Sequence, residues 1–218
     1  MSNEKEVSSV SVQMLRRLPY YHYYLKALHN ENVPSISSAT IAKDLHLNEV
    51  QVRKDLAMVS SVKGKPKTGF PVNSMLDDIE EFLGYRNIDK AVLVGAGYLG
   101  KALMSYKGFD NYGLEIVAAF DNNQVIIDTE INGKPILPIE HLTKLCKRMH
   151  ILIGIIAVPD EAAQGVCDML VEAGVLGIWN FAPVNLFVPE GVLVQNENMA
   201  VSLTLLSKHL LNKFDHNE

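Results

Sequence analysis

The chain has 218 residues, of which 48% are hydrophobic and 21% charged, and this composition excludes a wholly disordered or fibrous protein. No apolar run approaches the ~18 residues of a membrane span, and the first ten residues lack the apolar segment of an export signal. We therefore expect a cytoplasmic protein without a membrane partner. The two cysteines and seven histidines show no metal-ligand spacing, so we expect no metal site.

The net charge of −5 is unevenly distributed. Residues 1–80 hold ten Lys and Arg against nine Asp and Glu, whereas residues 81–218 hold ten against sixteen. Within residues 43–67, six basic side chains stand against three acidic ones. A basic patch on an acidic protein favours a DNA-reading module attached to a domain with another role. A solvated helix face beside a lysine-rich loop would give the same charge.

Helical spacing of apolar residues predicts a first helix over 11–29, with Pro19 in its first turn or at a kink. Residues 35–59 then predict two short helices separated by a turn at 46–47. Ser37 or Ser38 would cap the first of these helices, and Asn48 would cap the second.

The second of these helices has a core side and an exposed side. Val52, Leu56 and Val59 recur at i, i+4 and i+7 and must face the core. The side chains expected to face outward or to lie at the flank are Gln51, Arg53, Lys54 and Met58. This layout predicts a helix-turn-helix whose second helix presents its first turns to a DNA major groove.

Residues 63–69 contain three lysines, two glycines and a proline, followed by an extended stretch over 70–72. This composition predicts a basic turn between short strands, a wing whose Lys65 and Lys67 rest on phosphate. A flexible linker between domains is the alternative. A capped acidic helix over 73–83 would end at Gly84, where we place the domain boundary.

From residue 90 onward, apolar strands alternate with helices. The strands are predicted at 91–96, 114–121, 134–138, 151–158, 177–182 and 191–195, and the helices at about 98–106, 139–149 and 160–173. Such alternation predicts an α/β domain, a doubly wound parallel sheet covered on both faces. A last amphipathic helix over 198–214 has a stripe of Met199, Leu203, Leu206 and Leu210, which packs on its own sheet or on a partner.

A glycine-rich loop follows the first of these strands and opens a helix. Its residues are Gly95, Ala96, Gly97, Tyr98, Leu99 and Gly100. In such a loop the first glycine permits a tight turn, the second lets a pyrophosphate approach, and the third lets helix pack closely on strand. Asp121 ends the next strand, 26 positions after Gly95, where a carboxylate accepts a hydrogen bond from a ribose and repels a 2′-phosphate. The motif predicts NAD(H) binding; a Rossmann fold that has lost its ligand is the alternative.

Hydride chemistry is not expected, because residues 90–195 leave little room for a substrate domain or a convincing proton donor. Tyr106 is either a cofactor contact or a core tyrosine. Asn180, at the end of a strand, either lines the nicotinamide end or serves packing alone. We also assign Pro159, after the strand at 151–158, to this ligand edge.

Five motifs in order resemble the Rex family of redox-sensing transcriptional repressors. They are RRLP at 16–19, QVRKDL at 51–56, the glycine loop with VAAFD at 117–121, WNFAP at 179–183, and the final helix. The resemblance implies a winged-helix DNA-binding domain at 1–84, a Rossmann domain at 85–196 and a dimerisation helix at 197–218 that is exchanged between subunits. It implies a repressor without enzymatic activity, a homodimer that binds a palindromic operator in double-stranded DNA and releases it when NADH rises.

The resemblance also assigns residues. Arg53 and Lys54 would contact the operator, with Gln51 and Asn48 near base edges. We also assign Ser38 to the DNA-binding surface. Gly95, Gly97, Gly100 and Asp121 would hold the dinucleotide. Tyr106 falls on the family tyrosine beside the nicotinamide, and Met199 reaches from the exchanged helix toward the partner's cofactor.

Three positions depart from the family pattern. Tyr23 stands where the first helix commonly carries an arginine, and Asn198 stands where the last helix begins with an aspartate. The wing over 59–70 lacks the usual aromatic, glycine-rich stretch with arginine. We therefore expect weakened redox discrimination and an altered operator. A small NAD-dependent oxidoreductase and a binding module for another adenine ligand, such as coenzyme A, remain the alternatives.

Overall fold

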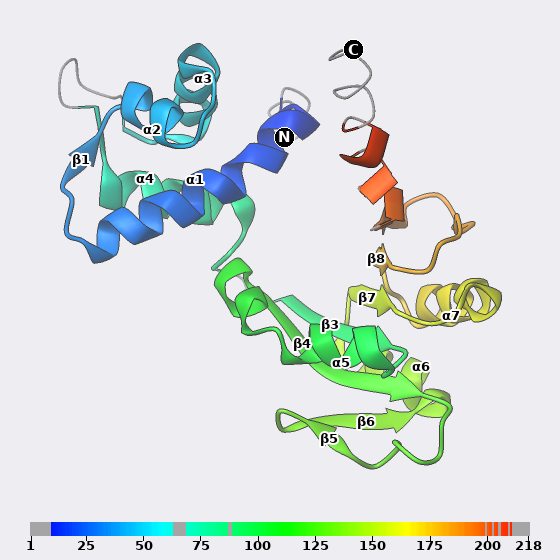
Figure 1. Ribbon diagram of the computed structural model, residues 1–218. Coiled ribbons are helices and arrows are strands. Elements are labelled where there is room, and N and C mark those ends of the chain that lie inside the picture. Colours follow the sequence, from blue (N-terminus) through cyan, green and yellow to red (C-terminus); the bar gives the residue numbers. More distant parts are fainter. Residues whose placement is uncertain are drawn as a thin grey trace. The chain divides into compact units, whose positions relative to one another are not determined.

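The computed structural model describes residues 10–62, 69–86 and 89–198, together with residues 200, 201, 203, 204, 206–208 and 210. The chain divides into two compact units, Met1–Arg86 and Asn87–Glu218 (Figure 1). Each unit has buried apolar residues of its own. No helix in the described part of the chain is long and apolar enough to cross a membrane.

The first unit contains four helices and two very short strands among its described residues. These are α1 (Val12–Asn30), β1 (Ser35–Ile36), α2 (Ser38–Asp44), α3 (Glu49–Val59), β2 (Phe70–Pro71) and α4 (Val72–Leu83). The two strands pair antiparallel, with Ile36 opposite Phe70. Leu18 of α1, Leu56 of α3 and Ile79 of α4 are fully buried in one core, so the predicted inward face of the second short helix is confirmed.

Local capping explains where these helices begin. Ser11 accepts a hydrogen bond from the Met14 N–H, so α1 starts at residue 12 and Pro19 lies inside it. The first-turn placement of Pro19 was therefore wrong. Ser37, rather than Ser38, caps α2, and Asn48 caps α3 as predicted.

The ends of α4 follow the sequence only in part. Gly84 adopts φ +74° and ends the helix, as predicted, because a left-handed residue closes a helix at little cost when it has no Cβ. The helix begins at Val72, one residue before the predicted start, with Pro71 ahead of it and no cap from the side chain of a described residue. The wing lysines at 63, 65 and 67 lie outside the described residues.

The second unit is built on a seven-stranded sheet in the order β5-β6-β4-β3-β7-β8-β9. Its strands are β3 (Asp89–Val94), β4 (Leu114–Asp121), β5 (Glu130–Ile131), β6 (Lys134–Pro138), β7 (Ile153–Ile156), β8 (Gly177–Asn180) and β9 (Leu193–Asn196). Between residues 89 and 198 its α-helices are α5 (Tyr98–Ser105), α6 (Leu142–Met149) and α7 (Asp160–Glu172). All neighbouring strands pair parallel except β5 with β6.

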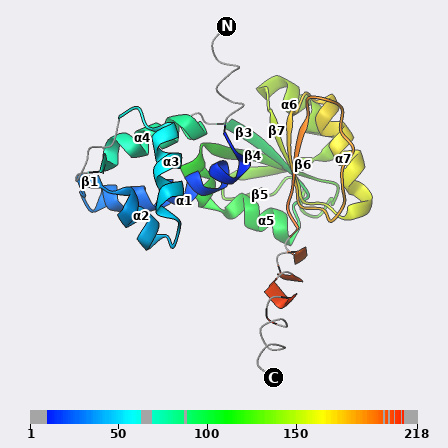
Figure 2. The same cartoon turned by 90° about the horizontal axis from the view of Figure 1, so that it is seen from above.

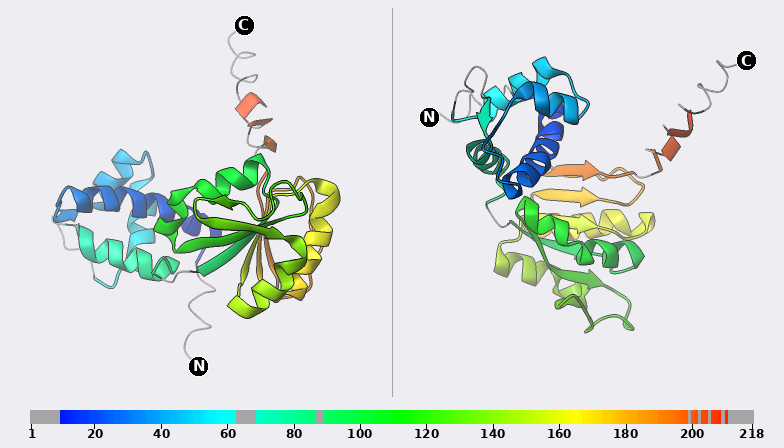
Figure 3. Two further views of the ribbon diagram at one scale, coloured as in Figure 1. Left: turned by 90° about the horizontal axis from the view of Figure 1, so that it is seen from below. Right: turned by 60° about the vertical axis from the view of Figure 1, so that its left-hand side comes forward.

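Helices cover both faces of this sheet, which confirms the α/β class (Figure 2). On β3, Val92 and Val94 point into the core shared with α6 and α7, whereas Leu93 packs with Met104 of α5. Figure 3 shows the strands fanning out with the twist of an open parallel sheet. β3, the first strand of this unit, lies at the centre of the sheet, with β4 on one side and β7 on the other.

Several boundaries differ from the sequence expectations. The helix predicted from 139 begins with a 3-10 turn, Ile139–His141, and a second 3-10 turn spans Lys107–Tyr112. The strand predicted over 177–182 ends at Asn180, since that side chain bonds the backbone of the following loop. β5 was missed because two residues are too few for a periodic pattern.

The described residues between 200 and 210 are helical. Leu203, Leu206 and Leu210 of this segment are 64%, 56% and 47% exposed in the single chain. Met199 lies outside the described residues. These three leucines of the predicted apolar stripe are therefore uncovered within one chain.

Candidate functional site

The glycine-rich loop joins β3 to α5, and each of its three glycines has a different surrounding. Gly95 adopts φ +98°, and a Cβ there would lie 2.5 Å from the Ala157 carbonyl oxygen. A Cβ on Gly100 would lie 1.9 Å from the carbonyl oxygen of Gly95, so this glycine serves helix-on-strand packing. A Cβ on Gly97 would meet nothing within 4 Å. The second glycine therefore borders open space, where a ligand can approach the backbone.

Helix α5 begins directly at this open space. Its N-cap is Gly97, and among the described residues no side chain caps the helix. Unpaired N–H groups and the helix dipole favour an anion at such an end. The loop is thus suited to a phosphate group.

A cavity of about 260 Å³ lies against the loop, at the carboxyl ends of β3, β4 and β7. Chain order reverses between these strands, and open parallel sheets bind ligands at such a switch point. Most of the wall is apolar, formed by Val94, Phe120, Ile139, Val158, Ala162 and Val166. Such a wall suits a flat aromatic ring such as adenine.

Four of the predicted cofactor residues line this cavity. They are Gly95, Gly97, Asp121 and Pro159. Sequence reasoning missed Asn122 and Ile139, which follow the carboxyl ends of β4 and β6. The switch-point rule could have found them, because neighbouring parallel strands end at the same edge.

Asp121 holds the loop as well as lining the cavity. Its Oδ2 accepts a hydrogen bond from the Ala96 N–H at 2.7 Å, and its Oδ1 accepts one from the Asn123 N–H at 2.9 Å. An ionised carboxylate has about four acceptor positions, so it can also accept from a ribose hydroxyl. The carboxylate thus connects the turn after β3 to the turn after β4.

The other predicted cofactor residues that the structure describes are not among those that line this cavity. Ala96 and Gly100 are buried and Leu99 is half-buried, whereas Tyr98 is 99% exposed. Tyr106 is 57% exposed, with its ring edge-on to that of Phe109 at 4.9 Å.

Asn180 is fully buried and engaged within the protein. Its Nδ2 donates to the Val184 carbonyl oxygen at 2.9 Å and to the Asn196 Oδ1 at 2.8 Å, and its Oδ1 accepts from the Ala182 N–H. These contacts tie the loop after β8 to β9 and correspond to the packing interpretation of this residue.

The face of α3 that points away from the core contains the predicted DNA-binding residues. Gln51, Arg53 and Lys54 are exposed, whereas Val52 is fully buried. The Asn48 side chain accepts from the Gln51 N–H at 3.1 Å and so fixes the first turn of α3. Ser38 is half-buried at the start of α2.

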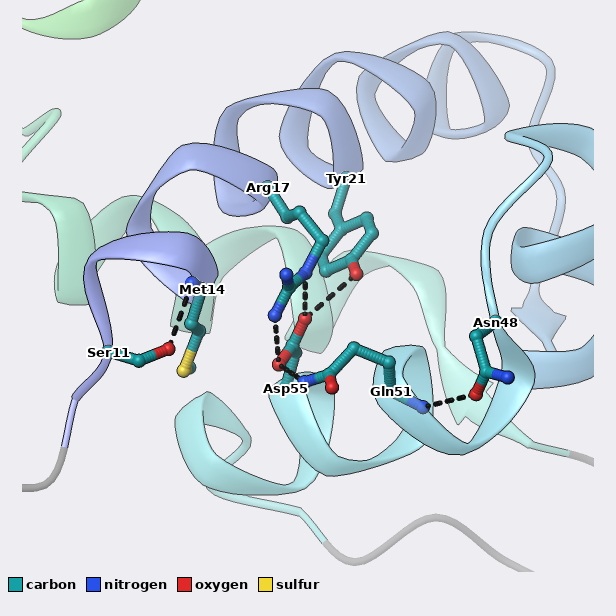
Figure 4. A network of polar contacts seen from close by, with 7 residues as sticks. All are labelled: Ser11, Met14, Arg17, Tyr21, Asn48, Gln51 and Asp55. Atoms are coloured by element: carbon teal, nitrogen blue, oxygen red, sulfur yellow. Dashed lines mark hydrogen bonds and ion pairs between the residues drawn. The ribbon is translucent and has the colours of Figure 1, made fainter.

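Sequence reasoning missed one polar residue of α3 that faces the core. Asp55 is 3% exposed and forms a two-point ion pair with Arg17 of α1, with Nε–Oδ2 and Nη2–Oδ1 distances of 2.7 and 3.1 Å (Figure 4). The Tyr21 hydroxyl donates to Oδ2 at 2.9 Å. Burial raises the pKa of the Asp55 carboxyl, but the hydrogen bonds from Arg17, Gln51 and Tyr21 outweigh it and hold the pKa below its ordinary value.

Two family models match the chain. One is described as "CoA binding domain" and covers residues 86–184, and the other is described as "Putative DNA-binding protein N-terminus" and covers residues 9–57.

Curated relatives match nearly the whole length. The redox-sensing transcriptional repressor Rex of Porphyromonas gingivalis is 40% identical over 94% of this chain and 95% of its own length. The repressor of the same name from Bacteroides thetaiotaomicron is 36% identical over 98% of this chain and 94% of its own length.

Solved structures also match nearly the whole length of the chain. The crystal structure of RSP in complex with β-NAD⁺ and operator DNA matches with a TM-score of 0.88 at 31% identity, covering 95% of both chains. The crystal structure of RSP in complex with β-NADH matches with a TM-score of 0.83 at 31% identity, covering 96% of this chain and 99% of that one.

Proposed function

Because the chain belongs to the Rex family of redox-sensing transcriptional repressors, we propose that it represses transcription by binding an inverted-repeat operator as a homodimer under the control of NAD(H). The observation that carries the proposal is the presence, in one chain, of an exposed helix-turn-helix face and a glycine-loop cavity at a sheet switch point. The relatives are repressors, not enzymes. We also propose that this repressor acts in the cytoplasm.

The dinucleotide fits the residues that the cavity offers. Open space at Gly97 and the uncapped start of α5 suit the pyrophosphate, and the apolar wall suits adenine. Asp121 would accept from a ribose hydroxyl and disfavour a 2′-phosphate. Bound NAD(H) supplies a nicotinamide whose charge differs between its two redox forms.

The DNA-binding surface would comprise the outward side chains of α3 and the wing. Gln51 lies near base edges, and Arg53 and Lys54 contact the operator. Ser38 and Asn48 border this surface, and Lys65 and Lys67 would rest on phosphates. Two copies are needed because one helix-turn-helix covers a half-site.

We also propose three functional segments: a winged-helix DNA-binding domain at 1–84, a dinucleotide-binding domain at 85–196, and a dimerisation segment at 197–218. The exposed Leu203, Leu206 and Leu210 support the last of these. A swapped helix would cover them with the partner's surface.

DNA binding tests the proposal directly. A duplex selected from a random pool by the wild-type chain serves as the probe, and fluorescence anisotropy gives its affinity. The double change Arg53→Ala with Lys54→Ala should weaken binding to the selected duplex by tenfold or more, whereas Lys147→Ala on the exposed face of α6 should not. Unchanged affinity of the double variant would contradict the proposal.

Ligand choice is tested by thermal shift, since a ligand that binds only the folded chain raises its melting temperature. NADH, NAD⁺, NADPH, ATP and coenzyme A are compared at equal concentration. NADH or NAD⁺ should give the largest shift. A larger shift with coenzyme A would favour the ligand after which the matching family model is named.

A further inference from the structure

We infer that Asp55 is a positioning residue that fixes the side-chain amide of Gln51 in the orientation that reads an adenine in the major groove, an inference that rests on the proposed DNA-binding function. The Gln51 Nε2 donates to the Asp55 Oδ1 at 2.8 Å, one helical turn along α3 (Figure 4). Gln51 is exposed, whereas Asp55 is buried. The pair therefore connects the proposed reading face to the core.

The chemistry of Asp55 decides which way the amide of Gln51 points. A carboxylate has no hydrogen to donate, so only the NH₂ end of the amide can face it. A flipped amide would set its Oε1 against a carboxylate oxygen, leaving two acceptors face to face. The bond to Asp55 thus specifies the positions of both the donor and the acceptor end of Gln51.

Asp55 itself is held by a second helix. Arg17 and Tyr21 lie one turn apart on α1 and together donate three hydrogen bonds to the two carboxylate oxygens. Each oxygen of Asp55 therefore accepts two hydrogen bonds, counting the one from Gln51. Because α1 anchors the carboxylate, the Gln51 amide is ordered before DNA arrives, which reduces the entropy lost on binding.

The remaining groups of the Gln51 amide match one base. With one Nε2 hydrogen on Asp55, the amide offers its other hydrogen and Oε1 side by side. Adenine presents the complementary pair in the major groove, with N7 as acceptor and N6–H as donor, whereas guanine presents two acceptors. Gln51 is the third residue of α3, and the N-terminal residues of a recognition helix contact base edges.

A base-by-base affinity profile tests this inference. The duplex selected by the wild-type chain is changed at one base pair at a time, and anisotropy gives the affinity of wild type, Gln51→Ala, Asp55→Asn and the double variant. Gln51→Ala and Asp55→Asn should each lose the preference at the same A·T pair, by about fivefold or more, and the double variant should lose no more. Affinity for a random duplex should stay unchanged, which a merely structural loss would not produce.

The chain provides a matched control on α7. The Gln164 Nε2 donates to the Asp168 Oδ1 at 2.7 Å with the same four-residue spacing, but outside the proposed DNA-binding surface. Asp168→Asn should leave the base profile unchanged.

Base analogues test the contact on the wild-type protein. Purine lacks N6, and 7-deazaadenine lacks N7; either one at the A·T pair should weaken wild-type binding and leave Gln51→Ala unaffected. The inference is overturned if Asp55→Asn keeps the preference, if Gln51→Ala relaxes no A·T pair, or if neither analogue has an effect. A wild-type chain that binds selected and random duplexes equally would instead contradict the proposed function.

If Asp55→Asn fails to fold, amide exchange in the wild-type chain takes its place. The side-chain amide hydrogens of Gln51, assigned by NMR with Gln51→Ala, should exchange with water more slowly than those of the exposed Gln13 on α1. Equal exchange rates would show that Asp55 does not hold the amide.

Discussion

At the level of single residues, Asp55 should make the first unit sensitive to acid. Its pKa is depressed in the folded chain, so the carboxylate stabilises the fold above its unfolded pKa of about 3.9 and loses this effect as pH falls through the folded value. Asp55→Asn should therefore flatten the acid limb of the stability curve. At neutral pH the variant should be less stable by up to about 3–5 kcal/mol, an upper bound because Arg17 is 22% exposed.

Helical circular dichroism during thermal unfolding at pH 7 and at pH 3 measures this effect. The fluorescence of Trp179, the only tryptophan in the chain, reports on the second unit and should show the same transition in both proteins. Parallel pH profiles for wild type and variant would mean that Asp55 does not govern the acid response.

Gly97 and Gly100 should respond differently to the same substitution. Gly97→Ala adds a methyl group to open space at φ −69°, so folding should be unaffected while NADH affinity falls by about tenfold, or ~1.4 kcal/mol. Gly100→Ala would place its Cβ 1.9 Å from the Gly95 carbonyl oxygen and should lower the melting temperature of the second unit.

Calorimetric titration with NADH and a Trp179 melting curve separate the two effects. If Gly97→Ala binds NADH as tightly as wild type, the phosphate does not approach the loop at that glycine.

At the level of elements, the last helix should control assembly. Leu203, Leu206 and Leu210 are exposed in the single chain, and each fully buried large apolar side chain contributes roughly 1.5–3 kcal/mol. Deleting residues 197–218 should therefore give a monomer or an aggregate. Light scattering decides the point, and a soluble dimer that survives the deletion would place the main interface elsewhere.

Sequence periodicity was sufficient for the elements with strong patterns. Strand Leu114–Asp121 and the buried Val52 and Leu56 of α3 agree with it, because each of these follows from a repeating apolar position. The burial of Asp55 could not be predicted in this way, because a charged residue on the core side is stabilised by its ion pair with Arg17, which is 38 positions away in the chain. Asn180 likewise takes its role from Asn196, a neighbour that the sheet order supplies.

At the level of the whole molecule, the redox response should be weak. NAD⁺ and NADH differ by one positive charge at the nicotinamide, and a unit charge pair at ~4 Å is worth about 4 kcal/mol gross at an effective dielectric of ~20. Tyr23 is 73% exposed, and Asn198 accepts from the N–H groups of Ala200 and Val201; neither brings a charge. Without the family's arginine and aspartate, the two affinities should differ by less than about tenfold, or ~1.4 kcal/mol.

Calorimetry with each dinucleotide measures the difference. A hundredfold tighter binding of NADH would rule out this expectation. The double change Tyr23→Arg with Asn198→Asp should increase the discrimination, and the aspartate can still accept from the same two N–H groups.

In this chain, dinucleotide binding is proposed to control DNA binding. A ligand shifts a DNA-binding equilibrium only as far as its affinities for the free and DNA-bound forms differ. The most direct measurement is the affinity of the full chain for its selected inverted-repeat duplex without ligand, with saturating NAD⁺ and with saturating NADH. The dimer should bind this duplex in preference to random DNA, and NADH should weaken the binding. Equal affinity in all three conditions, with calorimetry showing that the dinucleotides are bound, would contradict it.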